Sequence, residues 1–144
     1  MILYLDTSAL VKRYFHEPYS DDVISRWKAA TQIVTSFVAY AETMASIYRK
    51  KRESDLGDTL INKIADTFQR DWESFIRVVV NDKLSEYINR IVKKYPLRGF
   101  GAIHLASAIV IHERVSEDFI FACFDDKLVD AAQFEGLVTF SPKK

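Results

Sequence analysis

Short apolar runs alternate along the chain with segments whose apolar residues recur at helical spacing. The runs have the length of strands and are ILYL (2–5), IVT (33–35), IRVVV (76–80), FIFACF (119–124) and LVTF (137–140). The segments between them predict helices over about 7–15, 20–30, 37–51, 56–72, 82–95, 99–114 and 125–134. Several of these segments open on residues that favour helix N-termini, namely Thr7, Ser8, Ser20 and Ser36.

This alternation of apolar strands and helices is typical of an α/β fold with a parallel sheet. Because the strands are apolar throughout, we expect helices to cover both faces of the sheet. ILYL is predicted to be the central strand. The functional crevice of such a sheet lies beyond the carboxyl ends of its strands. Residues 1–144 are expected to form one domain, since their number suits one hydrophobic core.

Composition indicates the cellular location of the protein and limits its possible partners, but it does not indicate a function. The apolar runs fall well short of the ~20 residues that a membrane helix needs, so no membrane partner is expected. A single cysteine, Cys123, and an N-terminus without a basic leader indicate a reducing, cytoplasmic location. Lys and Arg together number 20, as do Asp and Glu, so any affinity for nucleic acid must come from local charge.

Three carboxylates stand apart from the mixed-charge segments that hold most of the acids. Asp6 follows ILYL, at the end of the predicted central strand. Glu42 lies alone in FVAYAETMASIY, and Asp125 directly follows FIFACF with Asp126 beside it. Two interpretations remain open for each. A strand-end Asp can be a helix cap and a lone Glu can lie on an exposed stripe, or these groups can belong to one functional site.

The predicted topology favours a shared site, because it places Asp6 and Asp125 at the same edge of the sheet, on strands that can be neighbours. A buried carboxylate needs a partner, a proton or a cation. Converging carboxylates suit Mg²⁺ or Mn²⁺, which keep water ligands for a substrate phosphate, so metal-assisted phosphodiester hydrolysis is the chemistry indicated. The rival is a phosphoacceptor receiver domain, which would need an acidic pair after the first strand, where this chain has Asp6 alone.

The chain resembles the PIN-domain nucleases, and specifically the VapC-type toxins of toxin–antitoxin pairs. The resemblance rests on four segments in the family's order and spacing: YLDTSALVKRY (4–14), AYAETMAS (39–46), LRGFGAIHLASA (97–108) and FDDKLVDAA (124–132). It implies a three-layer α/β fold with a parallel sheet of about four or five strands, and an endoribonuclease that uses Mg²⁺ or Mn²⁺. The implied partners are an RNA substrate, a VapB-type antitoxin and a second copy of the chain in a homodimer.

The resemblance also implies roles for the three isolated acids. Asp6 would be the first acid of the site and a metal ligand, with Thr7 and Ser8 as polar neighbours. Glu42 would be the second acid. The cluster of acids would activate water for attack on an RNA phosphate.

Asp125 would be the fourth acid and a metal ligand. It is preferred over Asp126 because Leu128 stands at the family's +3 position, and Asp126 would then be an auxiliary acid. His104 matches a family position, but we interpret it as a packed, hydrogen-bonded core histidine. Basic residues near the predicted crevice are either contacts for RNA phosphates or an ordinary solvated surface: Lys12, Arg13 and Arg98.

The family's third acid is missing from this chain. The toxins usually carry a segment like LRGxDAIHLASA, and Gly101 stands where the Asp is expected. Its loss should weaken metal binding and slow hydrolysis, because the placement of the metal sets the geometry of attack. Three accounts remain open: an inactivated form, a natural member with residual activity, or a natural pseudo-nuclease that binds RNA or antitoxin without cutting.

Overall fold

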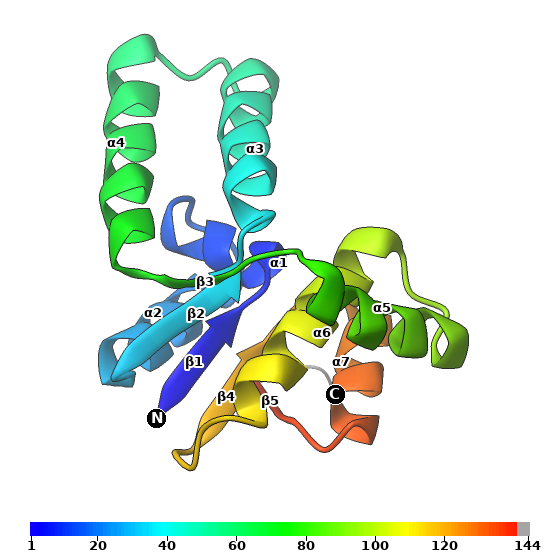
Figure 1. Ribbon diagram of the computed structural model, residues 1–144. Helices are drawn as coiled ribbons and strands as arrows, with labels where there is room; N and C mark the ends of the chain where they lie inside the picture. The colour runs from blue at the N-terminus through cyan, green and yellow to red at the C-terminus, as the bar shows by residue number, and fades with distance from the viewer. Residues whose placement is uncertain (141–144) are drawn as a thin grey trace.

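A computed structural model gives the structure of residues 1–140 and shows a five-stranded sheet flanked by helices (Figure 1). The predicted domain, 1–144, extends beyond these described residues. The strands are β1 (Ile2–Leu5), β2 (Gln32–Ser36), β3 (Ile76–Val78), β4 (Phe119–Ala122) and β5 (Val138–Phe140). They lie in the order β3-β2-β1-β4-β5, and every neighbouring pair is parallel. The predicted parallel sheet, with ILYL at its centre, is confirmed.

The helices follow the predicted segments, with different ends. They are α1 (Thr7–Leu10), a 3₁₀ turn η1 (Val11–Arg13), α2 (Ser20–Ala29), α3 (Ala39–Glu53), α4 (Asp58–Ser74), α5 (Asp82–Lys94), α6 (Gly99–His112) and α7 (Asp126–Phe134). The single helix expected over about 7–15 is wrong, since α1 ends after four residues and continues only as the 3₁₀ turn. The N-cap of α2 is Tyr19 rather than Ser20, whose hydroxyl instead donates to the carbonyl of Phe15.

Ser36 is also not the helix cap that its sequence position predicts. It is the last residue of β2, and the next residue, Phe37, still donates its backbone N–H to the carbonyl of Val78. The Ser36 hydroxyl accepts from the N–H of Val38, and α3 begins only at Ala39. Strand pairing with β3 therefore delays the helix by two residues.

The sheet separates two apolar clusters, which makes the fold three-layered. Side chains of successive strand residues point to opposite faces, so Ile2 and Tyr4 of β1 pack with α5, α6 and α7. Leu3 and Leu5 pack on the other face with α1, α2, α3 and α4. The two longest helices, α3 and α4, stand together as a hairpin that extends away from the sheet (Figure 1). No helix within residues 1–140 is long and apolar enough to cross a membrane.

The carboxyl ends of the two central strands bring the predicted acids together. β1 and β4 are paired in register, with Leu5 opposite Ala122. Asp6 and Asp125 follow these strands and are the N-caps of α1 and α7. The cap interpretation is thus correct for both residues, and so is the prediction that they share one edge of the sheet.

Candidate active site

A cleft of about 1060 Å³ opens at this edge of the sheet. Its walls come from the starts of α1, α6 and α7 and from the first turn of α3. Four acidic residues predicted from the sequence line it, together with two polar neighbours and the glycine that stands where the resemblance leads one to expect a third acid: Asp6, Glu42, Asp125, Asp126, Thr7, Ser8 and Gly101. The geometry brings together segments that are far apart in the chain.

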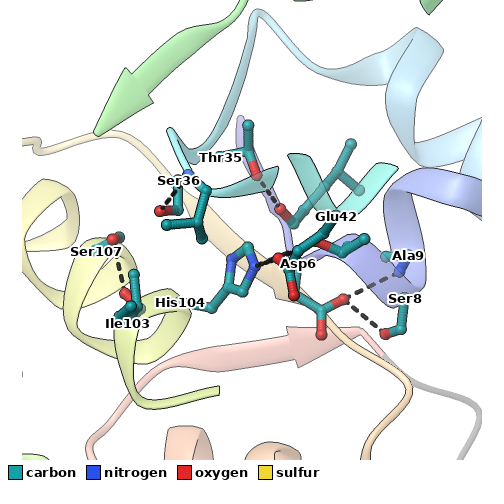
Figure 2. Close-up of polar contacts among 12 residues, drawn as sticks. Asp6, Ser8, Ala9, Thr35, Ser36, Glu42, Ile103, His104 and Ser107 are labelled. Atoms are coloured by element: carbon teal, nitrogen blue, oxygen red, sulfur yellow. Dashed lines mark hydrogen bonds and ion pairs between the residues drawn. The ribbon is translucent and has the colours of Figure 1, made fainter. Parts of the chain in front are cut away.

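Asp6 is a buried carboxylate held by neutral donors. Its side chain Oδ1 accepts from the Ser8 hydroxyl at 2.7 Å and from the backbone N–H of Ala9 at 3.0 Å, and the residue is 5% exposed (Figure 2). Burial raises the pKa of Asp6 above its usual value, although these hydrogen bonds favour the ionised form. The Ser8 hydroxyl also accepts from the N–H of Phe124 at 3.0 Å, which ties the start of α1 to the loop that carries Asp125.

Glu42 reaches the cleft from α3 and is held by two other elements. Its Oε1 accepts from the Thr7 hydroxyl at 2.6 Å and lies 3.0 Å from Nε2 of His104. Figure 2 shows the His104 ring directed from α6 toward this carboxylate, with Asp6 beside it. Burial alone would raise the pKa of Glu42, but the hydrogen bonds from His104 and Thr7 outweigh it and lower the pKa. The interpretation of Glu42 as one acid on a solvated stripe is therefore wrong.

Asp125 and Asp126 are the more exposed acids of the cleft. Asp125 Oδ1 accepts from the backbone N–H of Leu128 at 3.0 Å, as an N-cap does. Asp126 follows in the first turn of α7. Carboxylates at this position interact favourably with the positive end of the helix dipole, which helps the fold to accommodate both charges.

Gly101 lies in the first turn of α6, a turn that contains no acidic residue. A Cβ atom placed on Gly101 would meet only the methyl groups of Leu128, at 3.9 and 4.0 Å, which is ordinary van der Waals contact. Its backbone is helical, and the positive-φ glycine of residues 1–140 is Gly136 instead. Neither space nor backbone conformation therefore requires a glycine at position 101.

The three predicted basic residues are placed differently. Arg98 lines the cleft, whereas within residues 1–140 Lys12 and Arg13 are not part of its lining. Lys12 pairs with Glu17 at 3.3 Å, and Arg13 pairs with Asp71 at 3.2 Å. Both cations are thus engaged in ion pairs with carboxylates that do not line the cleft.

The structure adds lining residues that the sequence did not single out. Lys127 and Phe100 both line the cleft, and Phe100 is 57% exposed. His104 is buried, as predicted for a core histidine, but it also contacts Glu42 and lines the cleft. A signal for His104 was present in the sequence, since it is the only ionisable side chain in the apolar segment from Gly99 to Ile111.

The carboxylates of the cleft are the candidate ligands for a divalent cation. Among the described residues, no three His, Cys, Asp or Glu side chains lie close enough to form a metal-binding group. Asp6 and Asp125 each use Oδ1 for a protein donor, and their carboxylates suit an ion such as Mg²⁺, which binds one or two carboxylates and keeps several waters. The residues therefore fit a weakly held, largely hydrated cation rather than a closed metal cage.

Comparison with known proteins places the chain in a family. The family described as PIN domain matches residues 3–132. Ribonuclease VapC45 from Mycobacterium tuberculosis is 28% identical over 94% of this chain and 92% of its own length. Two solved structures share the fold, each covering 99% of this chain and 98% of the other. FitAcB from Neisseria gonorrhoeae has a TM-score of 0.72 at 15% identity, and a toxin–antitoxin complex from Klebsiella pneumoniae has 0.68 at 15%. The family match covers most of the sequence and includes every acid of the cleft, and the chain therefore belongs to the PIN-domain family.

Proposed function

We propose that this protein is a VapC-type toxin, a divalent-metal-dependent endoribonuclease that a cognate antitoxin neutralises. The observation that carries the proposal is the convergence of Asp6, Glu42 and Asp125 on one cleft in a chain of the PIN-domain family. The name of the relative, a VapC ribonuclease, supports the activity. The similarity of fold to a chain of a toxin–antitoxin complex is consistent with an antitoxin partner.

In this proposal the acids divide the work of hydrolysis. Asp6 and Asp125 would hold Mg²⁺ or Mn²⁺, which supplies Lewis-acid chemistry to the substrate phosphate when bound. Glu42 would accept a proton from the attacking water, because it lines the cleft as an ionised carboxylate. The water oxygen then bonds to phosphorus, and the bond from phosphorus to the leaving oxygen breaks.

The same cleft offers contacts for RNA. Arg98 and Lys127 supply positive charge for the phosphates of the substrate. Phe100, at the start of α6, presents an exposed ring on which an unpaired base can stack. Lys12 and Arg13 contribute less in this proposal, because both are committed to ion pairs.

Gly101 reduces the activity of this chain in the proposal, because the first turn of α6 brings no carboxylate to the cleft. The alternative function is that of a catalytically inactive PIN domain that binds RNA or antitoxin only. The two functions differ in what a restored carboxylate does, since a nuclease with one missing acid should regain rate and a binding protein should not.

The test is the Gly101→Asp variant, assayed for RNA cleavage with Mg²⁺, with Mn²⁺ and with a chelator. A side chain fits at this position, so the variant should fold. Gly99→Asp is the matched control, because Gly99 lies in the same helical turn, lines the same cleft and has nothing within 4 Å of its Cβ position. We expect Gly101→Asp to cleave at least ~100-fold faster than the unchanged chain, and Gly99→Asp to gain little.

Two results would contradict the proposal in different ways. If the unchanged chain already cleaves as fast as Gly101→Asp, the glycine does not reduce activity. If both remain inert with either metal, the nuclease proposal fails and the binding function is favoured. Co-purification with an antitoxin encoded beside the toxin, and the mass of the isolated chain in solution, would test the proposed antitoxin partner and homodimer separately.

A further inference from the structure

The hydrogen bonds of His104 are more specific than core packing requires. The residue is 3% exposed, and both ring nitrogens have partners. Nδ1 lies 2.9 Å from the hydroxyl of Tyr4, and Nε2 lies 3.0 Å from Oε1 of Glu42 and 3.3 Å from the hydroxyl of Thr7. One ring thus connects the buried central strand with a carboxylate of the cleft.

The protonation states of the two neighbours fix the direction of these bonds. The Tyr4 phenol is buried and carries an O–H group that can donate to the ring. Glu42 is ionised at neutral pH and can only accept. In the neutral ring, Nδ1 therefore accepts from Tyr4, and the proton on Nε2 is donated to Glu42.

Tyr4, the buried end of this series of hydrogen bonds, is held in place by its own packing. The Tyr4 ring is fully buried and stacks on Phe121 of the neighbouring strand, with ring centroids 5.3 Å apart. Its ring meets that of His104 edge-on at 5.9 Å. The orientation of the imidazole is therefore set from the core of the sheet, and the Glu42 carboxylate is set by the imidazole.

We propose that His104 is a positioning residue, which fixes Oε1 of Glu42 through its Nε2 donor and so turns the other carboxylate oxygen, Oε2, toward the reacting water. The two contacts of Glu42 described above both engage Oε1, from Thr7 on one side and His104 on the other. The inference rests on the proposed nuclease function for its consequence in catalysis. The arrangement of the three side chains stands without that function.

The two amide replacements of His104 separate positioning from packing. In His104→Gln the side-chain amide nitrogen can occupy the place of Nε2, which keeps a donor for Glu42. In His104→Asn the amide is one carbon shorter and can replace only Nδ1, beside Tyr4. Both variants are polar and smaller than histidine, and Asn loses one buried methylene more than Gln, a packing difference that thermal unfolding measures separately. His112→Asn, at the exposed end of the same helix, is the control for loss of a histidine.

The measurements are steady-state cleavage over a range of RNA concentrations, thermal unfolding and a crystal structure of each variant, in the unchanged chain and in Gly101→Asp. We expect His104→Asn to lower kcat by about 10- to 100-fold with little change in KM, because a misplaced catalytic group costs rate rather than binding. His104→Gln should stay within about fivefold of its parent, since an amide N–H replaces the imidazole N–H as the donor to Glu42. The crystal structure of His104→Asn should show Glu42 turned away from its present place.

An equal loss of kcat in the Gln and Asn variants, together with an equal fall in Tm, would overturn the positioning role and leave only packing. If no chain cleaves RNA, Gly101→Asp included, the proposed function fails, and the crystal structures then decide the inference alone. Glu42 unmoved in His104→Asn would overturn it. Glu42 displaced in His104→Asn but retained in His104→Gln would support it.

Discussion

Asp6 and Glu42 line the same cleft, and their surroundings shift the pKa values of the two carboxylates in opposite directions. Asp6 sits at the end of a buried strand, where neutral donors are its hydrogen-bond partners and burial raises its pKa. Glu42 is 24% exposed at its side chain and is tied to His104 and Thr7, and its pKa is lowered. Two acids of one site thus have unequal tendencies to carry charge.

This difference indicates different tasks. Environments that push the pKa values of two neighbouring acids apart are typical of sites in which the acids have separate roles. Asp6 is buried among neutral hydrogen-bond donors, so binding of a cation would stabilise its charge, which suits Asp6 as a metal ligand. A carboxylate that is already ionised and hydrogen-bonded suits Glu42 as a base. By the same reasoning, the charge of Asp6 should lower the free energy of unfolding and the charge of Glu42 should raise it.

The largest expected effect is on the dependence of catalysis on metal, measured in the Gly101→Asp background. Asp6→Asn should raise the Mg²⁺ concentration for half-maximal cleavage by at least about tenfold, because a ligand charge is lost. Glu42→Gln should lower the rate at saturating Mg²⁺ by about 100-fold or more and leave that concentration nearly unchanged. Titrating Mg²⁺ against the cleavage rate distinguishes the two. If both variants shift the metal requirement equally, the division of roles is wrong.

The sequence was sufficient to predict the parallel sheet, its central strand and the shared edge of Asp6 and Asp125. Those features follow from apolar runs and from the order of strands and helices, both of which are local patterns. The ends of elements were harder to predict, because tertiary hydrogen bonds set them. Phe37 stays paired with Val78, and the N–H of Phe124 is taken by the Ser8 hydroxyl, so β4 ends two residues before the apolar run does.

The contact between Glu42 and His104 could not be predicted from the sequence, because it too depends on tertiary structure. The two residues are 62 positions apart, and the orientation of the imidazole depends on Tyr4 in a third element. Burial of His104 could be predicted from its apolar neighbours, but its partners could not. The ion pairs of Lys12 and Arg13 likewise depend on residues brought close only by the fold.

A smaller effect is expected on the free energy of unfolding in the absence of metal. Substitution of Asp6 and substitution of Glu42 should change it in opposite directions. Asp6→Asn keeps an N-cap oxygen for Ala9 and removes a buried charge, so the free energy of unfolding at pH 7 should rise by about 1 kcal/mol. Glu42→Gln weakens the hydrogen bonds from His104 and Thr7, so it should lower that free energy by about 1 kcal/mol. For a chain of this size each change corresponds to a Tm shift of about 2–4 °C.

Urea unfolding in a chelating buffer measures both changes, and Asp126→Asn is the matched control. Asp126 is an exposed acid in the first turn of α7, so its loss should cost only a few tenths of a kcal/mol, about the value of one helix-dipole interaction. A destabilised Asp6→Asn variant would show that the carboxylate of Asp6 contributes to the fold, and the contrast between the two acids would disappear.

The smallest expected effect is on pH dependence. The differences in unfolding free energy between the unchanged chain and the Asp6→Asn and Glu42→Gln variants should change with pH. The pKa of Asp6 is raised in the folded state, so its protonated form stabilises the native chain below the unfolded pKa of about 3.9, and this stabilisation is lost as pH rises through the folded pKa. The advantage of Asp6→Asn should therefore be absent below about pH 4 and grow toward neutral pH.

The pKa of Glu42 is lowered, so its ionised form stabilises the native chain above about pH 4.3, and the stabilisation is lost as pH falls through the folded pKa. The deficit of Glu42→Gln should therefore be complete at neutral pH and fade in acid. Unfolding free energies measured from pH 3 to 8 should thus show the two variants diverging on either side of the unchanged chain as pH rises. Two curves that run parallel to that of the unchanged chain would mean that charge on these carboxylates does not distinguish them.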